Sequence, residues 1–161
     1  MPIVFTPSLE HPPGTVLRLL REAWAPLWNP GLEANIRAFD REVTDHPETV
    51  GACTFVTCLD GEPIGMASFD SRPGPERGLI GWNCIVPEHQ GEGWGKAQIL
   101  EVLRRFGERG IRRACVTTTD EAFFVPAQHT YESCGFTIAR RTANNNIEYE
   151  LDLRGEIGSA S

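Results

Sequence analysis

One segment, residues 79–110, limits the fold more than any other part of the sequence. An almost wholly apolar run, LIGWNCIV (79–86), leads into PEHQGEGWGKA (87–97), which has a glycine at every second position from 91 to 95. The apolar run is typical of a strand that is covered on both faces. The next residues, QILEVLRRFGERG (98–110), carry apolar side chains at helical spacing. We therefore expect a strand, a glycine-rich turn and a helix in direct succession.

The glycines of this turn predict an anion-binding site. A chain accepts the entropic cost of so much glycine where side chains would block a close approach to the backbone. The first N–H groups of the following helix lack intrahelical partners, and the helix dipole adds a partial positive charge. Residues 90–96 are therefore expected to bind a phosphate or pyrophosphate, with Lys96 either adding a charge or lying in solvent. The alternative is a tight turn that binds no ligand.

Two common phosphate-binding patterns do not fit this segment. The P-loop requires four residues between its glycines and a Ser or Thr after its lysine. Here three residues separate Gly91 from Gly95, and Ala97 follows Lys96. The dinucleotide pattern GxGxxG starts at Gly91 and Gly93, but Lys96 occupies its third glycine position. The sequence therefore disfavours both kinds of nucleotide site.

A third pattern, Gln/Arg-x-x-Gly-x-Gly/Ala, matches QGEGWG (90–95) at every fixed position. This stretch resembles the acetyl-CoA loop of the GNAT family of acyl-CoA-dependent N-acetyltransferases. A second segment, AQHTYESCGF (127–136), is similar to the family's Ala-x-x-x-Tyr-Glu-x-x-Gly-Phe segment. The resemblance extends over residues 52–153 and implies the fold and the donor.

The resemblance also implies the parts of an active site. Acetyl-CoA would be the acyl donor, and its pyrophosphate would be held by Gln90, Gly91, Glu92, Gly93, Trp94, Gly95 and Lys96. The pantetheine arm would lie at Ile85 and Val86, where a strand N–H can stabilise a developing oxyanion. Tyr131 would protonate the leaving thiolate, because a phenol with a pKa of about 10 suits that task. The alternative for Tyr131 is a helix tyrosine that packs its ring and keeps its hydroxyl in water.

The sequence departs from the family pattern in two places. Phe124 stands three residues before Ala127, where many members have asparagine. One hydrogen bond to acetyl-CoA that the family makes is therefore in doubt. An acidic residue common early in the fourth strand is missing, since that region holds Gly81, Trp82 and Asn83. The general base is therefore not assigned. The candidates are water and six side chains, each of which could instead be a surface group without a catalytic role: Asp70, Asp120, Glu121, His129, Glu148 and Glu150.

The predicted function is acetyl transfer from acetyl-CoA to a primary amine, by direct attack and without a protein nucleophile. The acceptor is expected to be a small molecule or a peptide. Trp24, Trp28 and Phe39 in the N-terminal helices would either line an acceptor cleft or pack in the core. The alternative function is a non-catalytic acyl-CoA-binding or sensing module, which the missing acidic residue favours.

The remaining pattern predicts one α/β domain over residues 1–153, with a GNAT-like mixed, partly splayed sheet flanked by helices. Helices are expected over 14–27, 32–43, 98–110 and 125–135. Strands are expected over 52–59, 63–69, 79–86, 112–118, 136–142 and 146–153. Asn29–Pro30–Gly31 should separate the first two helices, and Asp60–Gly61 should form a hairpin turn. Residues 154–161 are expected to be a frayed tail.

Composition limits the partners. The net charge is −7 and no long basic run occurs, so a nucleic-acid surface is not expected. No apolar stretch approaches the roughly 18 residues of a membrane span, and the N-terminus lacks signal-peptide features, so we expect a cytoplasmic protein without membrane contact. Five cysteines show no metal-binding spacing and are expected to be buried free thiols, with no metal site. An exposed final strand would allow a homodimer.

Overall fold

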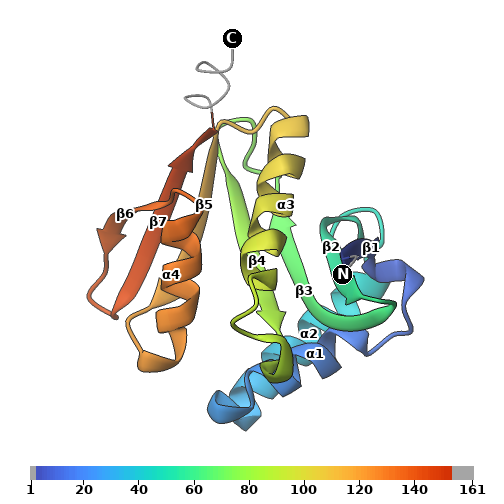
Figure 1. The fold of residues 1–161 in the computed structure, drawn as a ribbon. Helices are drawn as coiled ribbons and strands as arrows, with labels where there is room; N and C mark the ends of the chain where they lie inside the picture. The colour runs from blue at the N-terminus through green and yellow to red at the C-terminus, as the bar shows by residue number, and fades with distance from the viewer. Residues whose placement is uncertain (1–2, 154–161) are drawn as a thin grey trace. The chain divides into compact units, whose positions relative to one another are not determined.

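The computed structural model describes residues 3–153 and shows an α/β protein with a seven-stranded mixed sheet (Figure 1). Its strand order is β1-β2-β3-β4-β5-β7-β6. The strands are β1 (Ile3–Pro7), β2 (Thr54–Leu59), β3 (Glu62–Asp70), β4 (Gly78–Ile85), β5 (Arg113–Thr119), β6 (Thr137–Arg141) and β7 (Asn146–Asp152). The helices are α1 (Thr15–Ala23), α2 (Pro30–Asp45), α3 (Trp94–Glu108) and α4 (Val125–Ser133). The predicted fold class is confirmed, whereas the predicted tail, 154–161, lies outside the described residues.

The chain forms two compact units. The first unit comprises Met1–Ser68 and Trp82–Trp94, and the second comprises Phe69–Gly81 and Gly95–Ser161. The first unit therefore holds α1, α2, β1 and β2 with most of β3, and the second holds β5, α4, β6 and β7 with most of α3. Each unit is described by itself.

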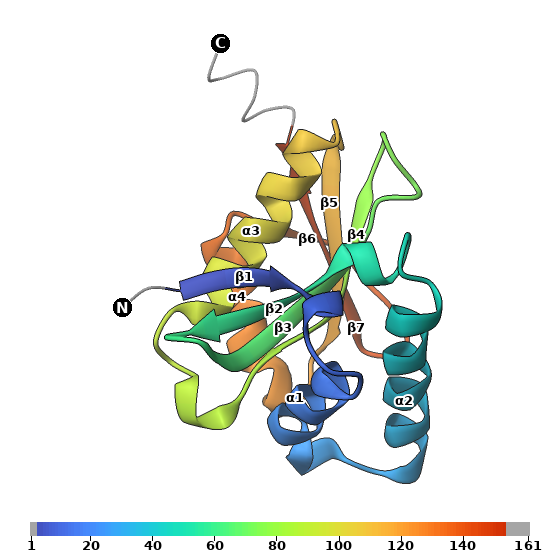
Figure 2. The same cartoon turned by 90° about the vertical axis from the view of Figure 1, so that its right-hand side faces the viewer.

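The core of the first unit lies between two helices and the sheet. Figure 2 shows α1 and α2 next to each other beside β1, β2 and β3. Leu19 and Leu20 of α1 and Ile36 of α2 are fully buried, and they pack with Val56 of β2 and Met66 of β3. The apolar stripe that predicts each helix is therefore the stripe that it buries.

The start of α2 differs from the prediction. Asn29, Pro30 and Gly31 were expected to separate two helices, but α2 already begins at Pro30. The Oδ1 atom of Asn29 accepts a hydrogen bond from the backbone N–H of Leu32 at 2.8 Å, which caps the helix. Pro30 fits the first helical position, because its missing N–H would have no intrahelical partner there.

Strand β1 was missed by the sequence prediction. It pairs antiparallel with β2, placing Phe5 opposite Thr57, and the rings of Phe5 and Phe55 meet edge to face at 5.3 Å. Its residues IVFT favour a strand, but prolines on both sides indicated an irregular segment. As the first strand in the order, β1 is an edge strand, where Pro7 removes no required ladder bond.

The second unit is built on β5, β6 and β7. β5 and β7 pair antiparallel from Arg113–Asp152 to Thr119–Asn146, and β7 also pairs with β6. β7 therefore lies between two strands, and the prediction of an exposed final strand is wrong; β6 is the edge. Figure 1 shows α4 beside β5 and β7.

The parallel register of β4 and β5 is short. It covers Gly78–Ile80 of β4 and Ala114–Val116 of β5. This register lies at the beginning of β4, which agrees with the expectation of a partly splayed sheet.

Gly78 is predicted to be sensitive to substitution, because a Cβ there would lie 2.6 Å from Cε1 of Phe106. Phe106 is fully buried and packs edge to face on Phe69 at 5.6 Å, so its ring has little room to move. Gly78→Ala should lower the free energy of unfolding by about 1–3 kcal/mol in a denaturant titration. Gly107→Ala is the matched control, since a Cβ there meets no atom within 4 Å. Equal unfolding midpoints for Gly78→Ala and wild type would contradict this packing.

Residues 3–153 contain neither a membrane-spanning helix nor a metal-binding cluster. No helix in this range combines the length and the apolar character needed to cross a membrane. Nor does this range contain a group of three or more His, Cys, Asp or Glu side chains that could hold a metal ion. The five cysteines are free thiols; Cys58 and Cys84 are buried, and the other three are half-buried. Burial raises the pKa of the Cys84 thiol to about 12.

Candidate active site

The turn between β4 and α3 has the backbone conformation that its glycines predict. A short 3-10 turn, Pro87–His89, follows β4, and α3 begins at Trp94. Gly91 has a φ of 80° and Gly93 a φ of 91°, in the left-handed region that favours glycine. A Cβ built on either residue would meet no atom of the chain within 4 Å. The glycines are therefore required by φ, and the space beside them is open.

Trp94, Gly95 and Lys96 form the first turn of α3. The N–H groups of a first helical turn lack intrahelical acceptors, and the helix dipole is positive at this end. The predicted pyrophosphate residues thus lie in one continuous segment that ends in a helix N-terminus. An open, left-handed glycine turn before that terminus fits a phosphate group.

The side chain of Gln90 makes a hydrogen bond within the turn. Its Nε2 donates a hydrogen bond to the carbonyl of Ile85 at 2.8 Å, which connects the turn to the end of β4. Glu92 in turn lies 3.3 Å from Nδ1 of His89. Both side chains therefore brace the turn.

Ile85 and Val86 differ in the direction of their N–H groups. The N–H of Val86 donates to the carbonyl of Ile64 at 2.8 Å, so it belongs to the pairing with β3. Because successive N–H groups of a strand point to opposite edges, the N–H of Ile85 points away from β3. Of the two predicted residues, Ile85 is the one whose N–H faces the edge opposite β3.

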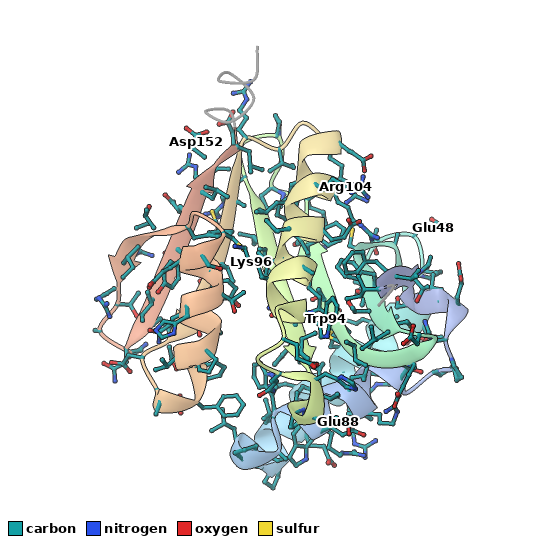
Figure 3. All side chains as sticks on the ribbon, viewed as in Figure 1. Glu48, Glu88, Trp94, Lys96, Arg104 and Asp152 are labelled. Carbon is teal, nitrogen blue, oxygen red and sulfur yellow. The ribbon has the colours of Figure 1, made fainter. Side chains whose placement is uncertain are left out.

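Trp94 and Lys96 leave opposite sides of the start of α3 (Figure 3). Trp94 is half-buried and packs against the core of the first unit. Its indole Nε1 is buried and, within residues 3–153, has no hydrogen-bond partner. Lys96 is exposed, and its charge offsets part of the rise that burial causes in the pKa of Cys134.

Tyr131 lies on α4 in the second unit. Pro126 stands in the first turn of this helix, and Gly135 with a φ of 100° ends it, as predicted. Tyr131 is 5 % exposed, and its ring lies 6.0 Å from that of Phe136 and 5.8 Å from that of Tyr149. The ring is therefore packed, and the position is compatible with a buried acid.

Tyr149 was not predicted as a site residue. Its hydroxyl donates a hydrogen bond to Oε2 of Glu132 at 2.7 Å. Burial, this hydrogen bond and the carboxylate charge together raise the pKa of Tyr149 to about 12. The alternation of β7 predicts that Tyr149 is buried, but the sequence does not show that its hydroxyl reaches Glu132.

The pKa of Tyr149 can be measured from the absorbance change of the phenol on ionisation. The sequence contains only one other tyrosine, Tyr131, whose signal a substitution can remove. In Tyr131→Phe, Tyr149 alone should titrate, near pH 12. Glu132→Gln should lower this pKa part of the way toward the usual value of about 10. Since unfolded tyrosine loses its proton first, the stability that Tyr149 contributes should fall as pH rises from about 10 toward 12. A titration near the usual value in the folded protein would contradict the described environment.

The candidate bases are largely paired. Asp70 meets Arg72 at 2.8 Å, and the hydrogen bond from Arg72 holds the pKa of Asp70 below its usual value. Glu148 pairs with Arg140 at 2.7 Å and Glu150 with Arg113 at 3.3 Å. Asp120, Glu121 and His129 are exposed. Three of the six candidates therefore carry an arginine partner, and the other three lie at the surface.

The N-terminal aromatic residues gather around β4. Trp82 of β4 lies 5.3 Å from Trp24 and 6.5 Å from Phe39, measured between ring centroids. All three rings are half-buried against the core of the first unit. Trp28 donates its Nε1–H to Glu33 at 3.0 Å. These rings pack against the core, which was one of the two alternatives for them, and each keeps part of its surface exposed.

A comparison with protein families identifies the class of the protein. Residues 15–136 match the model of the Acetyltransferase (GNAT) family, a range that includes the glycine turn and Tyr131. The chain belongs to the GNAT acetyltransferase family. The predicted family and enzyme class, an acyltransferase with acetyl-CoA as donor, are thereby confirmed. No curated protein sequence matches this GNAT acetyltransferase significantly.

Solved structures share the fold of this GNAT protein. A protein from Desulfovibrio desulfuricans assigned to the GNAT family is 20 % identical, with a TM-score of 0.78, and the match covers 94 % of this chain and 99 % of that one. The PaiA N-acetyltransferase from Thermoplasma acidophilum, solved in complex with coenzyme A, is 14 % identical (TM-score 0.73; coverage 94 % and 99 %). The ribosomal-protein-S18-alanine N-acetyltransferase from Escherichia coli is 16 % identical (TM-score 0.70; coverage 94 % and 94 %). At these identities the likeness establishes the fold alone.

Proposed function

We propose that this GNAT protein transfers the acetyl group of acetyl-CoA to a primary amine by direct attack. The observation that carries the proposal is the turn before α3, where Gly91 and Gly93 have positive φ and open space beside them. A helix N-terminus follows at once, so backbone N–H groups and the helix dipole are available for an anion. A coenzyme A pyrophosphate carries the negative charge that this helix N-terminus attracts. It can approach the backbone N–H groups closely because the glycines have no side chains.

The donor would be held by two adjacent parts of the chain. The backbone from Gly91 to Lys96 would bind the pyrophosphate, with Gln90 and Glu92 keeping the turn in shape through Ile85 and His89. The end of β4 at Ile85 and Val86 would hold the pantetheine arm. The N–H of Ile85 would be the donor at this point, because that of Val86 is bonded to Ile64.

Bound acetyl-CoA supplies a thioester carbonyl that an amine can attack and a thiolate that can leave. The N–H of Ile85 would stabilise negative charge on the carbonyl oxygen. Tyr131 would hold a proton on its Oη for the departing sulfur. Solvent is proposed to accept the proton of the amine, since Arg72 makes Asp70 a weaker base and Glu148 and Glu150 are ion-paired.

The acceptor is proposed to be a small-molecule or peptide amine. Trp24, Phe39 and Trp82 offer half-exposed rings near β4 on which its apolar part could pack. Five free thiols support a reducing compartment, and we propose the cytoplasm. A homodimer would use an edge strand, β1 or β6, in place of the final strand. The domain is proposed to extend over residues 1–153.

Calorimetric titration tests the donor part of the proposal. Acetyl-CoA and CoA should bind with micromolar affinity, whereas NAD and ATP should bind at least tenfold more weakly. The expected preference follows from the failure of the P-loop and dinucleotide patterns in this turn. A folded protein that binds neither acetyl-CoA nor CoA would refute the proposal.

A non-catalytic acyl-CoA-binding or sensing module is the second candidate. It is favoured by β4, where Gly81, Trp82 and Asn83 provide no carboxylate, and by the ion pairs of Glu148 and Glu150. The two functions differ in turnover. A sensing module would bind acetyl-CoA yet release no CoA thiol with any amine, whereas the enzyme would release it in step with the acetylated product.

A further inference from the structure

The two tyrosines of the sequence lie against each other in the second unit. Their ring centroids are 5.8 Å apart with an interplanar angle of 56°. Tyr149 is 1 % exposed, so its ring is more deeply buried than that of Tyr131. The proposed function uses Tyr131 alone and leaves the buried hydroxyl of Tyr149 without a role.

Helix α4 has little apolar surface to fix its orientation. It is nine residues long, and within it the structure shows Tyr131 as the buried residue. A helix with a narrow apolar face is oriented only partly by burial, so its polar contacts with the sheet contribute more to its orientation. The direction of the Tyr131 hydroxyl therefore depends on those bonds.

The bond from Tyr149 to Glu132 is such a bond. Glu132 follows Tyr131 directly, so it leaves the helix about 100° further round the axis. Its carboxylate accepts the Tyr149 hydroxyl at 2.7 Å, while the Tyr131 ring rests on the Tyr149 ring. Tyr149 of the sheet thus contacts two side chains of α4 that leave the helix in different directions. These two contacts fix the rotation of α4 about its axis.

The strand that carries Tyr149 is well held. Tyr149 is paired with Val116 of β5 on one side and with Ile138 of β6 on the other. At the other end of α4, Gln128 donates its Nε2–H to the carbonyl of Thr119 at 2.9 Å. The helix is therefore attached to the sheet near both ends, and the attachment next to Tyr131 is the one made by Tyr149.

We propose that Tyr149 and Glu132 are positioning residues that fix the orientation of Tyr131 for proton donation. The inference rests on the proposed function, in which Tyr131 is the acid. Tyr149 acts through its ring, which supports the Tyr131 ring, and through its hydroxyl, which binds Glu132. Tyr149→Phe separates these effects, because it keeps the ring and removes the hydrogen bond.

The first test observes Tyr131 directly and needs no ligand. With ¹³C-labelled tyrosine the protein gives two sets of ring signals, and the set remaining in Tyr149→Phe belongs to Tyr131. Loss of the Glu132 bond should shift and broaden the Tyr131 signals in Tyr149→Phe and in Glu132→Leu, which has no acceptor for the Tyr149 hydroxyl. Glu148→Leu is the matched control, since it removes a 2.7 Å bond to Arg140 in the same unit and should leave Tyr131 unchanged. Unchanged Tyr131 signals in Tyr149→Phe would overturn the inference.

The second test measures release of CoA thiol from acetyl-CoA, with 2-phenylethylamine as the probe acceptor and water alone for comparison. Tyr149→Phe should lower kcat about tenfold at unchanged KM for acetyl-CoA, as expected for a misplaced catalytic group. Because Tyr149 acts through Tyr131, the double variant with Tyr131→Phe should be no slower than Tyr131→Phe alone. A purely structural role would instead multiply the two losses, and this result would overturn the inference.

The outcomes separate the inference from the proposed function. If Tyr131→Phe lowers kcat but Tyr149→Phe does not, the inference fails and the acid role of Tyr131 stands. If Tyr131→Phe turns over as fast as wild type, or wild type releases no thiol with 2-phenylethylamine or any other primary amine, the proposed function fails and the inference fails with it.

Discussion

Tyr131→Phe is expected to lower kcat for acetyl transfer by roughly 100-fold, the lower range for loss of a general acid. The phenol is the proposed proton donor to the leaving thiolate, and phenylalanine removes its hydroxyl alone. The ring contacts with Phe136 and Tyr149 are retained, so the unfolding midpoint should change little. Binding of acetyl-CoA should also be unchanged, because the proton is needed only when the thiolate leaves. Thiol release and calorimetry measure the two quantities separately.

Thr130→Val is the matched control for this variant. It removes a neighbouring hydroxyl of α4, which donates to the carbonyl of Pro126 at 3.0 Å. This variant should keep the wild-type kcat, since the Thr130 hydroxyl serves the helix backbone. A Tyr131→Phe enzyme with wild-type kcat would refute the acid role and leave Tyr131 as a packing residue.

Gly93→Asp is expected to weaken acetyl-CoA binding by roughly 100-fold, the equivalent of about 2.8 kcal/mol. Gly93 has a φ of 91°, which costs a residue with a side chain about 1–2 kcal/mol. The new carboxylate would also stand beside the pyrophosphate, and two like charges a few ångströms apart repel by about 1 kcal/mol or more. Calorimetric titration of the variant with acetyl-CoA measures the sum of both effects.

Gly107→Asp carries the same substitution further along α3. A Cβ at Gly107 meets no atom within 4 Å and the residue lies at the opposite end of the helix, so acetyl-CoA affinity should not change. Gly93→Ala should give an intermediate loss, because it adds the strain without the charge. Wild-type affinity in Gly93→Asp would show that the turn is structural and binds no pyrophosphate.

The parts of the fold that sequence could predict are those in which one local pattern decides the structure. Asp60 and Gly61 have φ values of 51° and 84°, as a two-residue hairpin turn requires. The alternation of Ile147 and Tyr149 with Glu148 and Glu150 matches a strand with one buried face. In both cases neighbouring residues carry all the necessary information.

Other parts of the fold depend on contacts that are distant in the sequence. β1 is ordered by pairing with β2 about fifty residues later, and its flanking prolines indicate no such partner. Asn29–Pro30–Gly31 has the composition of a break, yet it starts a helix because Asn29 caps it. The final strand was placed at the edge because chain order does not reveal that β6 lies outside β7.

The same limit applies to the site. The glycine turn and Tyr131 stand in continuous motifs, so a single stretch of sequence identifies each. The bond between Tyr149 and Glu132 spans 17 residues, and that between Gln90 and Ile85 depends on the fold of the turn. The sequence contains these residues but gives no reason to pair them.

The most direct test of the account is to follow the acetyl group itself. The protein would be incubated with acetyl-CoA and a panel of primary amines, including amino acids, polyamines, 2-phenylethylamine and short peptides, and the amines analysed by mass spectrometry. At least one amine should gain an acetyl group with wild type, and gain it far more slowly with Tyr131→Phe. If acetyl-CoA binds but no amine in the panel is acetylated, the transferase proposal is contradicted and the sensing module becomes the better description.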